Sequence, residues 1–334
     1  MANSATVIKP HAERLRLRAG DLVRVRSADE ILRTLGADGS VDGLPFMPEM
    51  LAYCGQQFRV FRSAHKTCDT IDKTGIRRMR DAVHLEGLRC DGRAHGGCQA
   101  GCLLFWKDAW LERVDGPKDS APTEATLAQA REILLPGTRA SQASTDRHEL
   151  FRCQATELLR ATSPLSPWDP RPYLRDIWTR NVGLRELVWV LAVALFNRLQ
   201  SWRGGGSYPR FKPQLEKRTP SERLGLRPGD EVEVRAKEEI EKTVSAAGKN
   251  RGLWFDVEML PYCGGRYRVE RLVDKIIDEK TGRMLRLPNE CVVLEGVVCR
   301  AWFSRKRLFC PRSIPSYWRE IWLRRVDGSS GTTS

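Results

Sequence analysis

The 334-residue sequence lacks a long apolar run. Its longest is the ten residues 187–196 (LVWVLAVALF), about half of the roughly 20 residues that a membrane-spanning helix needs. The first twenty residues also lack the apolar segment of a signal peptide. We therefore expect a cytoplasmic protein without a transmembrane segment. Its ten cysteines are then reduced thiols, metal ligands or buried apolar groups rather than a disulfide framework.

Common catalytic motifs are absent too. The sequence contains no P-loop, GxGxxG, HExxH or GxSxG pattern. A cysteine hydrolase needs a thiol beside a histidine, but His65 and Cys68 would point to opposite faces of a strand. We expect a protein that is not an enzyme, and a thiol- or metal-dependent enzyme is the least favoured of the functions considered.

Positive charge is in excess. The formal net charge is +14 and the isoelectric point is near 9.6, which suits an acidic partner such as nucleic acid, an anionic membrane surface or an acidic peptide. A basic surface that only maintains solubility is an equal alternative. Acidic residues interrupt the basic ones, as in EVEVRAKEEIEK, so there is no clean basic stripe. Nucleic-acid binding therefore remains the second choice.

The clearest positive feature is an internal repeat. MLAYCGQQFRV at residues 50–60 recurs as MLPYCGGRYRV at 259–269, a spacing of 209 residues. The same spacing relates LEG at 85–87 to LEG at 294–296. After a shift of three residues, RVDG at 113–116 matches RVDG at 325–328. The chain is a tandem duplication.

Each copy has the pattern of a small β-domain. Alternating segments such as GDLVRVRS and GDEVEVRA predict half-buried strands, and DKTG and DEKTG predict hairpin turns. Helical spacing marks ADEILRTLG and KEEIEKTVSAAG. We predict a mainly β fold of two SH3-like barrels, each with a short helix. The expected divisions are residues 1–116, a connector at 117–219, residues 220–328 and a disordered tail at 329–334.

The connector differs in composition. Residues 117–147 are rich in Pro, Ser, Thr and Ala, which predicts a mobile or loosely docked linker. Helices are expected at 146–159 and 184–202. The second has apolar residues at helical spacing and needs cover. Packing against the two barrels is the preferred explanation, and a homodimer or a membrane-surface contact is the alternative.

The cysteines suggest a metal site in the first copy only. Residues 90–102 (CDGRAHGGCQAGC) hold three thiols and an imidazole, ligands that zinc prefers. We predict a structural zinc bound by His95, Cys98, Cys102 and Cys153, with Cys90 as the alternative to His95. Cys153 would tie the connector to the first copy. The competing explanation is a set of buried, reduced cysteines.

Three stretches carry a resemblance: residues 43–70, residues 81–111 and FRCQATELL at 151–159. They resemble a family of uncharacterised bacterial proteins found near biosynthetic genes. The two-copy form is similar to the peptide-binding accessory proteins of the crocagin pathway, which makes a ribosomally synthesised, modified peptide. The resemblance implies a non-catalytic protein that binds a precursor peptide and assists its modifying enzymes.

Peptide binding is compatible with the chemistry of the chain. Small barrels have exposed strand edges to which an extended peptide can add, and arginines attract an acidic segment or a terminal carboxylate. Candidate contacts are Arg59, Arg268, Tyr262 and Trp318, although core positions are the favoured places for the two aromatic residues. The acids shared by both copies, such as Glu49 and Glu258, are expected to accept backbone or arginine hydrogen bonds.

Overall fold

The computed structural model describes residues 15–114, 124–140, 149–166, 169–215, 218–304 and 306–326. The predicted boundaries at 116 and 328, the tail at 329–334 and parts of the 117–147 linker lie outside these residues. The fold is mainly β, as predicted, and its sheets are antiparallel.

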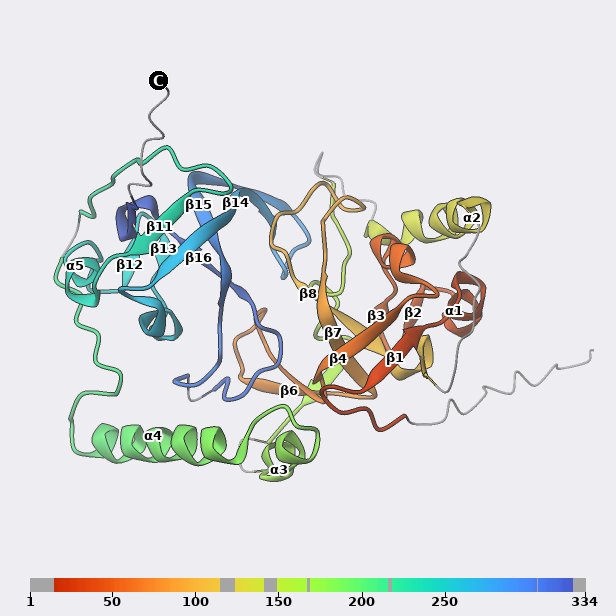
Figure 1. Ribbon diagram of the computed structural model, residues 1–334, viewed down its shortest axis with the longest axis horizontal. Helices are drawn as coiled ribbons and strands as arrows, with labels where there is room; N and C mark the ends of the chain where they lie inside the picture. Colours follow the sequence, from red (N-terminus) through yellow and green to blue (C-terminus); the bar gives the residue numbers. More distant parts are fainter. Residues whose placement is uncertain are drawn as a thin grey trace, which may run out of the picture.

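The first copy is a five-stranded antiparallel sheet with the order β8-β7-β4-β1-β9 (Figure 1). Its strands are β1 (Leu22–Val25), β4 (Gln57–Ser63), β7 (Ala82–Arg89), β8 (Leu103–Lys107) and β9 (Leu111–Arg113). A short pair, β2 (Ser40–Val41) and β3 (Leu44–Pro45), and the 3-10 helices η1 (Pro48–Tyr53) and η2 (Asp108–Trp110) complete the copy.

The second copy repeats this order as β16-β15-β14-β11-β17. Its elements are β11 (Glu231–Val234), β12 (Lys249–Asn250), β13 (Leu253–Trp254), η4 (Val257–Tyr262), β14 (Arg266–Ile277), β15 (Met284–Val298), β16 (Pro315–Trp318), η5 (Glu320–Trp322) and β17 (Leu323–Arg325). The strand register is repeated as well. Leu22 lies opposite Arg59, and Glu231 lies opposite Arg268.

Each copy has the expected short helix, α1 (Ala28–Thr34) or α5 (Lys237–Glu241). Each core is built around two buried tryptophans, Trp106 and Trp110 or Trp318 and Trp322. The repeated Tyr-Cys-Gly follows η1 or η4, and its glycine has a positive φ, 76° at Gly55. This turn leads the chain into β4 or β14, so the repeated motif is structural.

The connector is more ordered than predicted. It contains α2 (Glu124–Leu134), η3 (Leu135–Thr138), β10 (Thr162–Pro164), α3 (Arg171–Trp178) and α4 (Leu184–Trp202). The described part of the 117–147 segment is not loosely docked, because Ala130 and Leu134 of α2 are buried in the core of the first copy. The helix at 184–202 is confirmed as α4.

The helix predicted at 146–159 is wrong for the residues that the structure describes there. Residues 154–160 form turns. The side chain of Gln154 is buried and hydrogen-bonds both the N–H and the carbonyl of Phe105, at 2.9 Å each. These contacts with the edge strand β8 hold the segment against the sheet, and they outweigh the helical pattern of its apolar residues.

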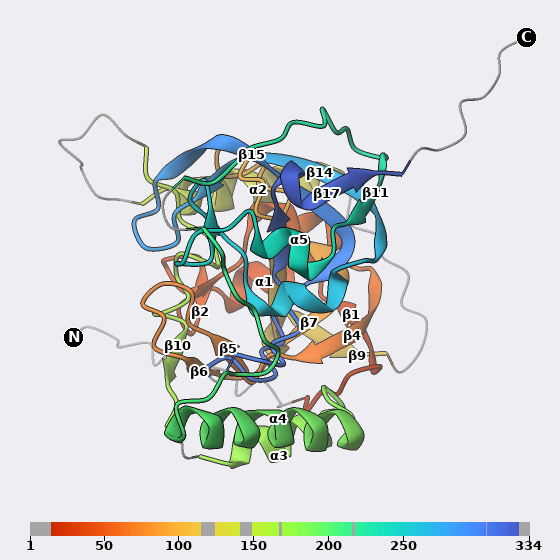
Figure 2. The ribbon, with the colours of Figure 1, turned by 90° about the vertical axis from the view of Figure 1, so that its left-hand side faces the viewer.

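The two copies contact each other through buried polar groups. Lys66 Nζ donates to the carbonyl of Leu308 (3.3 Å), and the Cys68 N–H donates to Cys310 Sγ (3.2 Å). Arg312, which is 4% exposed, donates to Thr70 Oγ1 at 2.8 Å. Figure 2 shows α3 and α4 together at the opposite edge of the molecule from β17.

Candidate functional site

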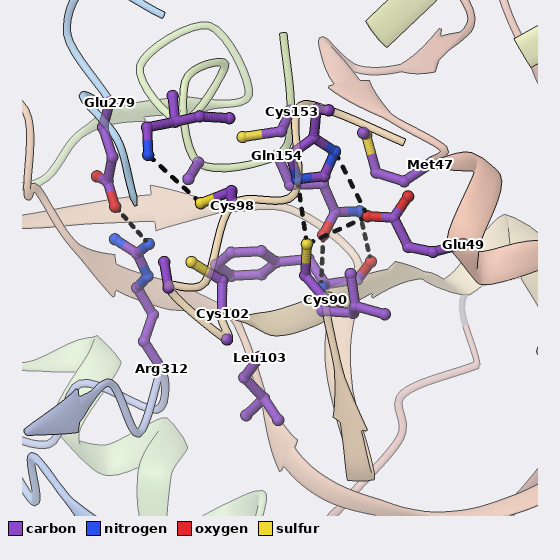
Figure 3. A pocket seen from close by; sticks show the side chains of 17 residues that line it. Met47, Glu49, Cys90, Cys98, Cys102, Leu103, Cys153, Gln154, Glu279 and Arg312 are labelled. Carbon is purple, nitrogen blue, oxygen red and sulfur yellow. Dashed lines mark hydrogen bonds and ion pairs between the residues drawn. The ribbon is translucent and has the colours of Figure 1, made fainter. Parts of the chain in front are cut away.

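A small cavity lies where the first copy, the connector and the second copy meet (Figure 3). Its volume is about 40 Å³, enough for an ion or a few waters, since one water needs roughly 10–15 Å³. The polar and sulfur-bearing side chains that line it are Met47, Glu49, Cys90, His95, Cys98, Cys102, Cys153, Gln154, Glu279 and Arg312.

Three potential metal ligands converge at one end of this cavity. Cys90 Sγ lies 3.3 Å from His95 Nε2 and 3.2 Å from Glu49 Oε1. The third pair, His95 Nδ1 and Glu49 Oε1, is 3.9 Å apart. Ligands of a tetrahedral zinc lie about 3.5 Å from one another, given Zn–S near 2.3 Å and Zn–N near 2.0 Å. The two His95 distances involve different ring nitrogens. With one donor atom from each residue, the three atoms all lie within 4.8 Å of one another.

Two buried atoms of this cluster have no hydrogen-bond partner. These are Glu49 Oε2 and His95 Nδ1, on side chains that are 6% and 1% exposed. In the second copy, the equivalent Glu258 accepts from the backbone N–H groups of residues 302, 303 and 304. A buried carboxylate costs free energy unless it is paired. In the first copy, a bound cation would compensate the buried carboxylate of Glu49, as the backbone N–H groups compensate that of Glu258 in the second.

The loop that carries His95 depends on glycine. Gly92 has φ +71°, and a Cβ there would lie 2.0 Å from the carbonyl oxygen of Cys98. The His95 N–H donates to the Gly92 carbonyl, and the Cys90 N–H donates to the Cys102 carbonyl at 2.8 Å. The loop is thus folded back on itself, which brings His95 beside Cys90.

The predicted ligand set differs from the one that converges. Cys98, Cys102 and Cys153 line the same cavity, but among the described residues the close cluster consists of Glu49, Cys90 and His95. Cys98 Sγ instead accepts the Ile277 N–H at 3.4 Å. His95 and the alternative ligand Cys90 were therefore found from the sequence, and Glu49 was missed. Because Glu49 and Glu258 occupy the same position in the two copies, both were expected to accept backbone or arginine hydrogen bonds.

Burial controls the chemistry of these groups. It raises the pKa of the Cys90 thiol, raises that of Cys102 to about 12 and that of Cys153 to about 11. Burial also lowers the pKa of His95. The thiols are protonated at neutral pH and therefore poor nucleophiles. The neutral imidazole is in the form that binds a metal.

The predicted peptide contacts are mostly unavailable. Trp318 is fully buried in the second core, and Tyr262 is 3% exposed with its hydroxyl bonded to the Val298 carbonyl. Both aromatic residues are core groups. Arg59 and Arg268 are exposed, but they bond within their own copy, to the Gly20 carbonyl and to Glu231.

A strand edge of the first copy is occupied by the connector. β5 (Lys66–Cys68) pairs with β6 (Ile76–Met79), and β10 of the connector adds to the other side of β6. Arg77 holds this added strand. Its Nε donates to Thr162 Oγ1 at 2.7 Å, and its Nη2 donates to the Thr162 carbonyl at 3.0 Å. An extended Thr-Ser-Pro segment is thus seated on the first copy.

The equivalent edge of the second copy is open beyond Arg283, which forms an isolated bridge with Leu150 of the connector. Residues 275–277 of β14 and 284–286 of β15 form the equivalent hairpin. In the described part of the chain, no strand pairs with the other side of residues 284–287, because β16 begins its pairing at Val292. Arg286 faces Lys275 as Arg78 faces Lys66, so by strand register Arg286 is the counterpart of Arg78, and Leu285 is the counterpart of Arg77. Arg286 is exposed. Leu285 is also 43% exposed.

A larger groove lies between the segment after α4 and the second copy. Its volume is about 1060 Å³, and its walls include Tyr208, Trp254 and Phe303 together with Arg210 and Lys306. Aromatic and cationic side chains together suit ligands that combine flat rings with negative charge.

Comparison with known proteins gives no relative from which a function could be transferred: no protein-family model, curated protein or solved structure matches this chain.

Proposed function

We propose that this chain is a non-catalytic peptide-binding protein in which two SH3-like barrels present a free strand edge on the second copy. The ligand is an extended segment of a ribosomal precursor peptide, and the bound protein assists the enzymes that modify it. The proposal rests on the pairing of β10 with β6. In the first copy, this connector strand occupies the edge whose counterpart in the second copy is open.

Strand addition explains how such a ligand would bind. Main-chain hydrogen bonds to an edge strand give affinity, and alternate side chains give selectivity. Arg77 contacts both the hydroxyl and the carbonyl of Thr162. On the open edge, the strand register puts Leu285 at the place of Arg77, and the exposed Arg286 follows it. The preferred ligand is therefore an extended segment that pairs with residues 284–287 and contacts Leu285 and Arg286.

The first test uses the chain's own bound segment as a probe. A labelled synthetic peptide of residues 158–166 (LLRATSPLS) is titrated into the full-length protein and followed by fluorescence anisotropy. We expect saturable binding of one peptide per chain and at least a tenfold loss with Arg286→Ala. Arg266, which is also exposed, is the matched control. Arg266→Ala is expected to leave binding unchanged. Absence of binding, or equal loss in both variants, contradicts strand addition at this edge.

The second test uses the precursor peptide encoded beside the gene. Isothermal titration is expected to show binding that competes with the 158–166 peptide. Lack of binding by both the unmodified and the modified precursor would overturn the proposed function, even if the short probe bound.

Nucleic-acid binding is the alternative, and the aromatic and cationic groove beside Tyr208 is the observation that favours it. Salt dependence separates the two functions. Release of counterions makes nucleic-acid affinity fall steeply with salt, whereas strand addition depends mainly on neutral hydrogen bonds. Binding of an oligonucleotide that is abolished by Lys306→Glu, without any peptide binding, would favour the alternative.

We further propose that Glu49, Cys90 and His95 hold a structural zinc, with one of the thiols of Cys98, Cys102 or Cys153 as the fourth ligand. All six residues line one cavity, and a Cys, His and carboxylate donor set is one that zinc accepts. The metal would join the first copy to the connector at Cys153. It would offset the buried, unpartnered atoms of Glu49 and His95.

Metal analysis of the purified protein tests the zinc proposal. We expect about one zinc per chain, lost in Cys90→Ser and His95→Ala, with a lower melting temperature after chelation. Cys54→Ser is the control, because Cys54 is buried outside the cavity and its variant retains the metal. A folded wild-type protein that holds no metal and takes up none from added zinc would disprove the site.

A further inference from the structure

Helix α4 exposes a continuous apolar stripe. Six side chains at helical spacing are at least 40% exposed: Leu184, Val188, Leu191, Leu195, Leu199 and Trp202. Positions 184, 188, 191, 195, 199 and 202 follow steps of three or four residues, so these side chains lie along one face. A row of this length is more than the scattered apolar residues that are usual on a soluble protein.

This stripe is not the face by which α4 packs on the protein. The packed face contains Leu187 and Val190, which are buried against Leu308 and Phe309. The buried side chain of Asn197 bonds the backbone of Tyr208, and Glu186 accepts from Trp302 Nε1 at 2.6 Å. The helix is therefore anchored on one side and leaves its second apolar side without a partner in the described part of the chain.

Helix α3 extends the exposed apolar surface. Leu174 and Trp178 of α3 are 64% and 42% exposed. Figures 1 and 2 both show α3 beside α4 at the same edge of the molecule, away from the two sheets. The two helices together form one outer surface with a tryptophan on each, Trp178 and Trp202. Tryptophan is enriched where a protein meets the interface of a membrane.

The charge around this surface has one sign. Residues 171–203 contain six arginines and two acids. One acid, Asp176, is fully buried, and the other, Glu186, is engaged by Trp302. On the helical wheel of α4, Arg198 flanks one side of the apolar stripe and Arg185 the other. An apolar stripe between arginines complements a layer of apolar chains beneath anionic headgroups.

A second copy of the chain is a poorer occupant. A twofold pair of α4 helices, whether parallel or antiparallel, would pack the same patch of both copies against itself. That arrangement brings arginines of one stripe border beside arginines of the other, with no exposed acid in α3 or α4 to compensate. None of the helices in the described part of the chain combines the length and apolarity that spanning a bilayer requires.

We propose that the outer surface of α3 and α4 binds the surface of an anionic membrane. The apolar stripe of α4 enters the boundary between headgroups and acyl chains, and the flanking arginines contact lipid phosphates. This surface is separate from both the open edge of β15 and the cysteine-lined cavity, so membrane binding is independent of the proposed peptide binding.

The test is sedimentation of the full-length protein with vesicles of phosphatidylcholine, with or without 30% phosphatidylserine. We expect binding to the anionic vesicles, a blue shift of tryptophan emission and weak binding to the neutral vesicles. Leu195→Glu is expected to weaken binding at least tenfold. Ile133→Glu on α2 is the matched control, because Ile133 and Leu195 are both 59% exposed, and this variant binds as wild type.

Two results would overturn the proposal. One is equal sedimentation of wild type and Leu195→Glu with anionic vesicles. The other is a wild-type dimer, measured by light scattering, that becomes a monomer in Leu195→Glu, because the stripe would then be covered by a second copy. An Arg185→Gln/Arg198→Gln variant that folds normally and keeps its affinity for anionic vesicles would contradict the role given to the arginines.

Discussion

At the scale of single residues, a buried ion pair joins the connector to the first copy. Lys66 and Asp176 are both 0% exposed and lie 2.5 Å apart. The Lys66 ammonium also lies 4.3 Å from the ring centroid of Tyr173. In the second copy the equivalent residue, Lys275, donates instead to the Gly96 carbonyl of the first copy. The buried pair is thus specific to the place where α3 docks.

Removal of one partner of this pair should be costly. Asp176→Asn leaves a buried, uncompensated ammonium, and we expect a loss of about 3–5 kcal/mol in the free energy of unfolding. The double variant Lys66→Met/Asp176→Leu should recover most of this loss, because no buried charge remains. Urea denaturation measures both. A single variant as stable as wild type would show that the pair is not buried in solution.

Buried histidines should make the fold sensitive to acid. Burial lowers the pKa of His84 to about 3. The hydrogen bond from its ring N–H to the Leu104 carbonyl raises the pKa, but by less than burial lowers it. The ordinary pKa is near 6.5, so between pH 6.5 and 3 the unfolded chain binds a proton that the folded chain does not. Stability therefore falls on acidification, by up to about 1.4 kcal/mol per pH unit.

The second copy supplies the variant that tests this. Val293 stands at the position of His84, and His84→Val should reduce the pH dependence of the free energy of unfolding below pH 6.5. Part of the dependence should remain, since burial also lowers the pKa of His65 to about 3. An unchanged slope in His84→Val would exclude His84 as one of the groups that titrate on unfolding.

At the same scale, sequence alone could identify residue types but not their neighbours. His95 and Cys90 stood out because the second copy lacks the imidazole. Glu49 did not, because its partner Glu258 is identical and only the backbone donors around the two differ. The two glutamates are identical in sequence, so the sequence does not reveal that their hydrogen-bond donors differ.

At the scale of elements, the two short helices differ in their N-caps. Ser27 caps α1, and its side chain exchanges hydrogen bonds with Glu30 in a capping box. Ala236 at the start of α5 has no side-chain oxygen with which to cap. We expect Ser27→Ala to destabilise the protein by about 1 kcal/mol.

The reciprocal change is the control. Ala236→Ser should leave stability equal to wild type or raise it, because it adds the missing acceptor to α5. Thermal denaturation of both variants decides the point. Equal destabilisation by both changes would mean that packing, rather than capping, determines the effect at position 27.

Helices could be predicted from the sequence where the periodic spacing of apolar residues was long. The helix at 184–202 has five turns of consistent spacing and was located correctly. A helix was also predicted at 146–159, but Gln154 bonds the backbone of β8 and the described part of this segment lies against the sheet instead. Contacts between distant segments are not present in a local pattern, and this explains the error.

At the scale of the whole molecule, the two copies share polar contacts that neither could satisfy alone. Arg312 of the second copy bonds Thr70 of the first, and Arg89 of the first donates to the Ser313 carbonyl at 3.1 Å. Separation of the copies would expose these groups and the cysteine-lined cavity. We therefore expect both copies to unfold in one calorimetric transition, with equal calorimetric and van't Hoff enthalpies.

Weakening the contact should split that transition. Arg312→Leu removes the buried guanidinium that bonds both Thr70 and Glu279, and we expect two overlapping peaks in this variant. Two well-separated peaks in the wild-type protein would instead show that the copies fold independently. The exposed pair Arg324 and Glu239, which lies within the second copy, is the control. Arg324→Ala should keep the single transition.

The strand β10 also has a consequence for the history of the chain. Immediately after a gene duplication, the two copies carried the same edge. Because the connector fills the first edge as the chain folds, the two edges are under different constraints. Thr162 and Arg77 should change together among relatives, because they contact each other, whereas Leu285 and Arg286 lie outside that pairing.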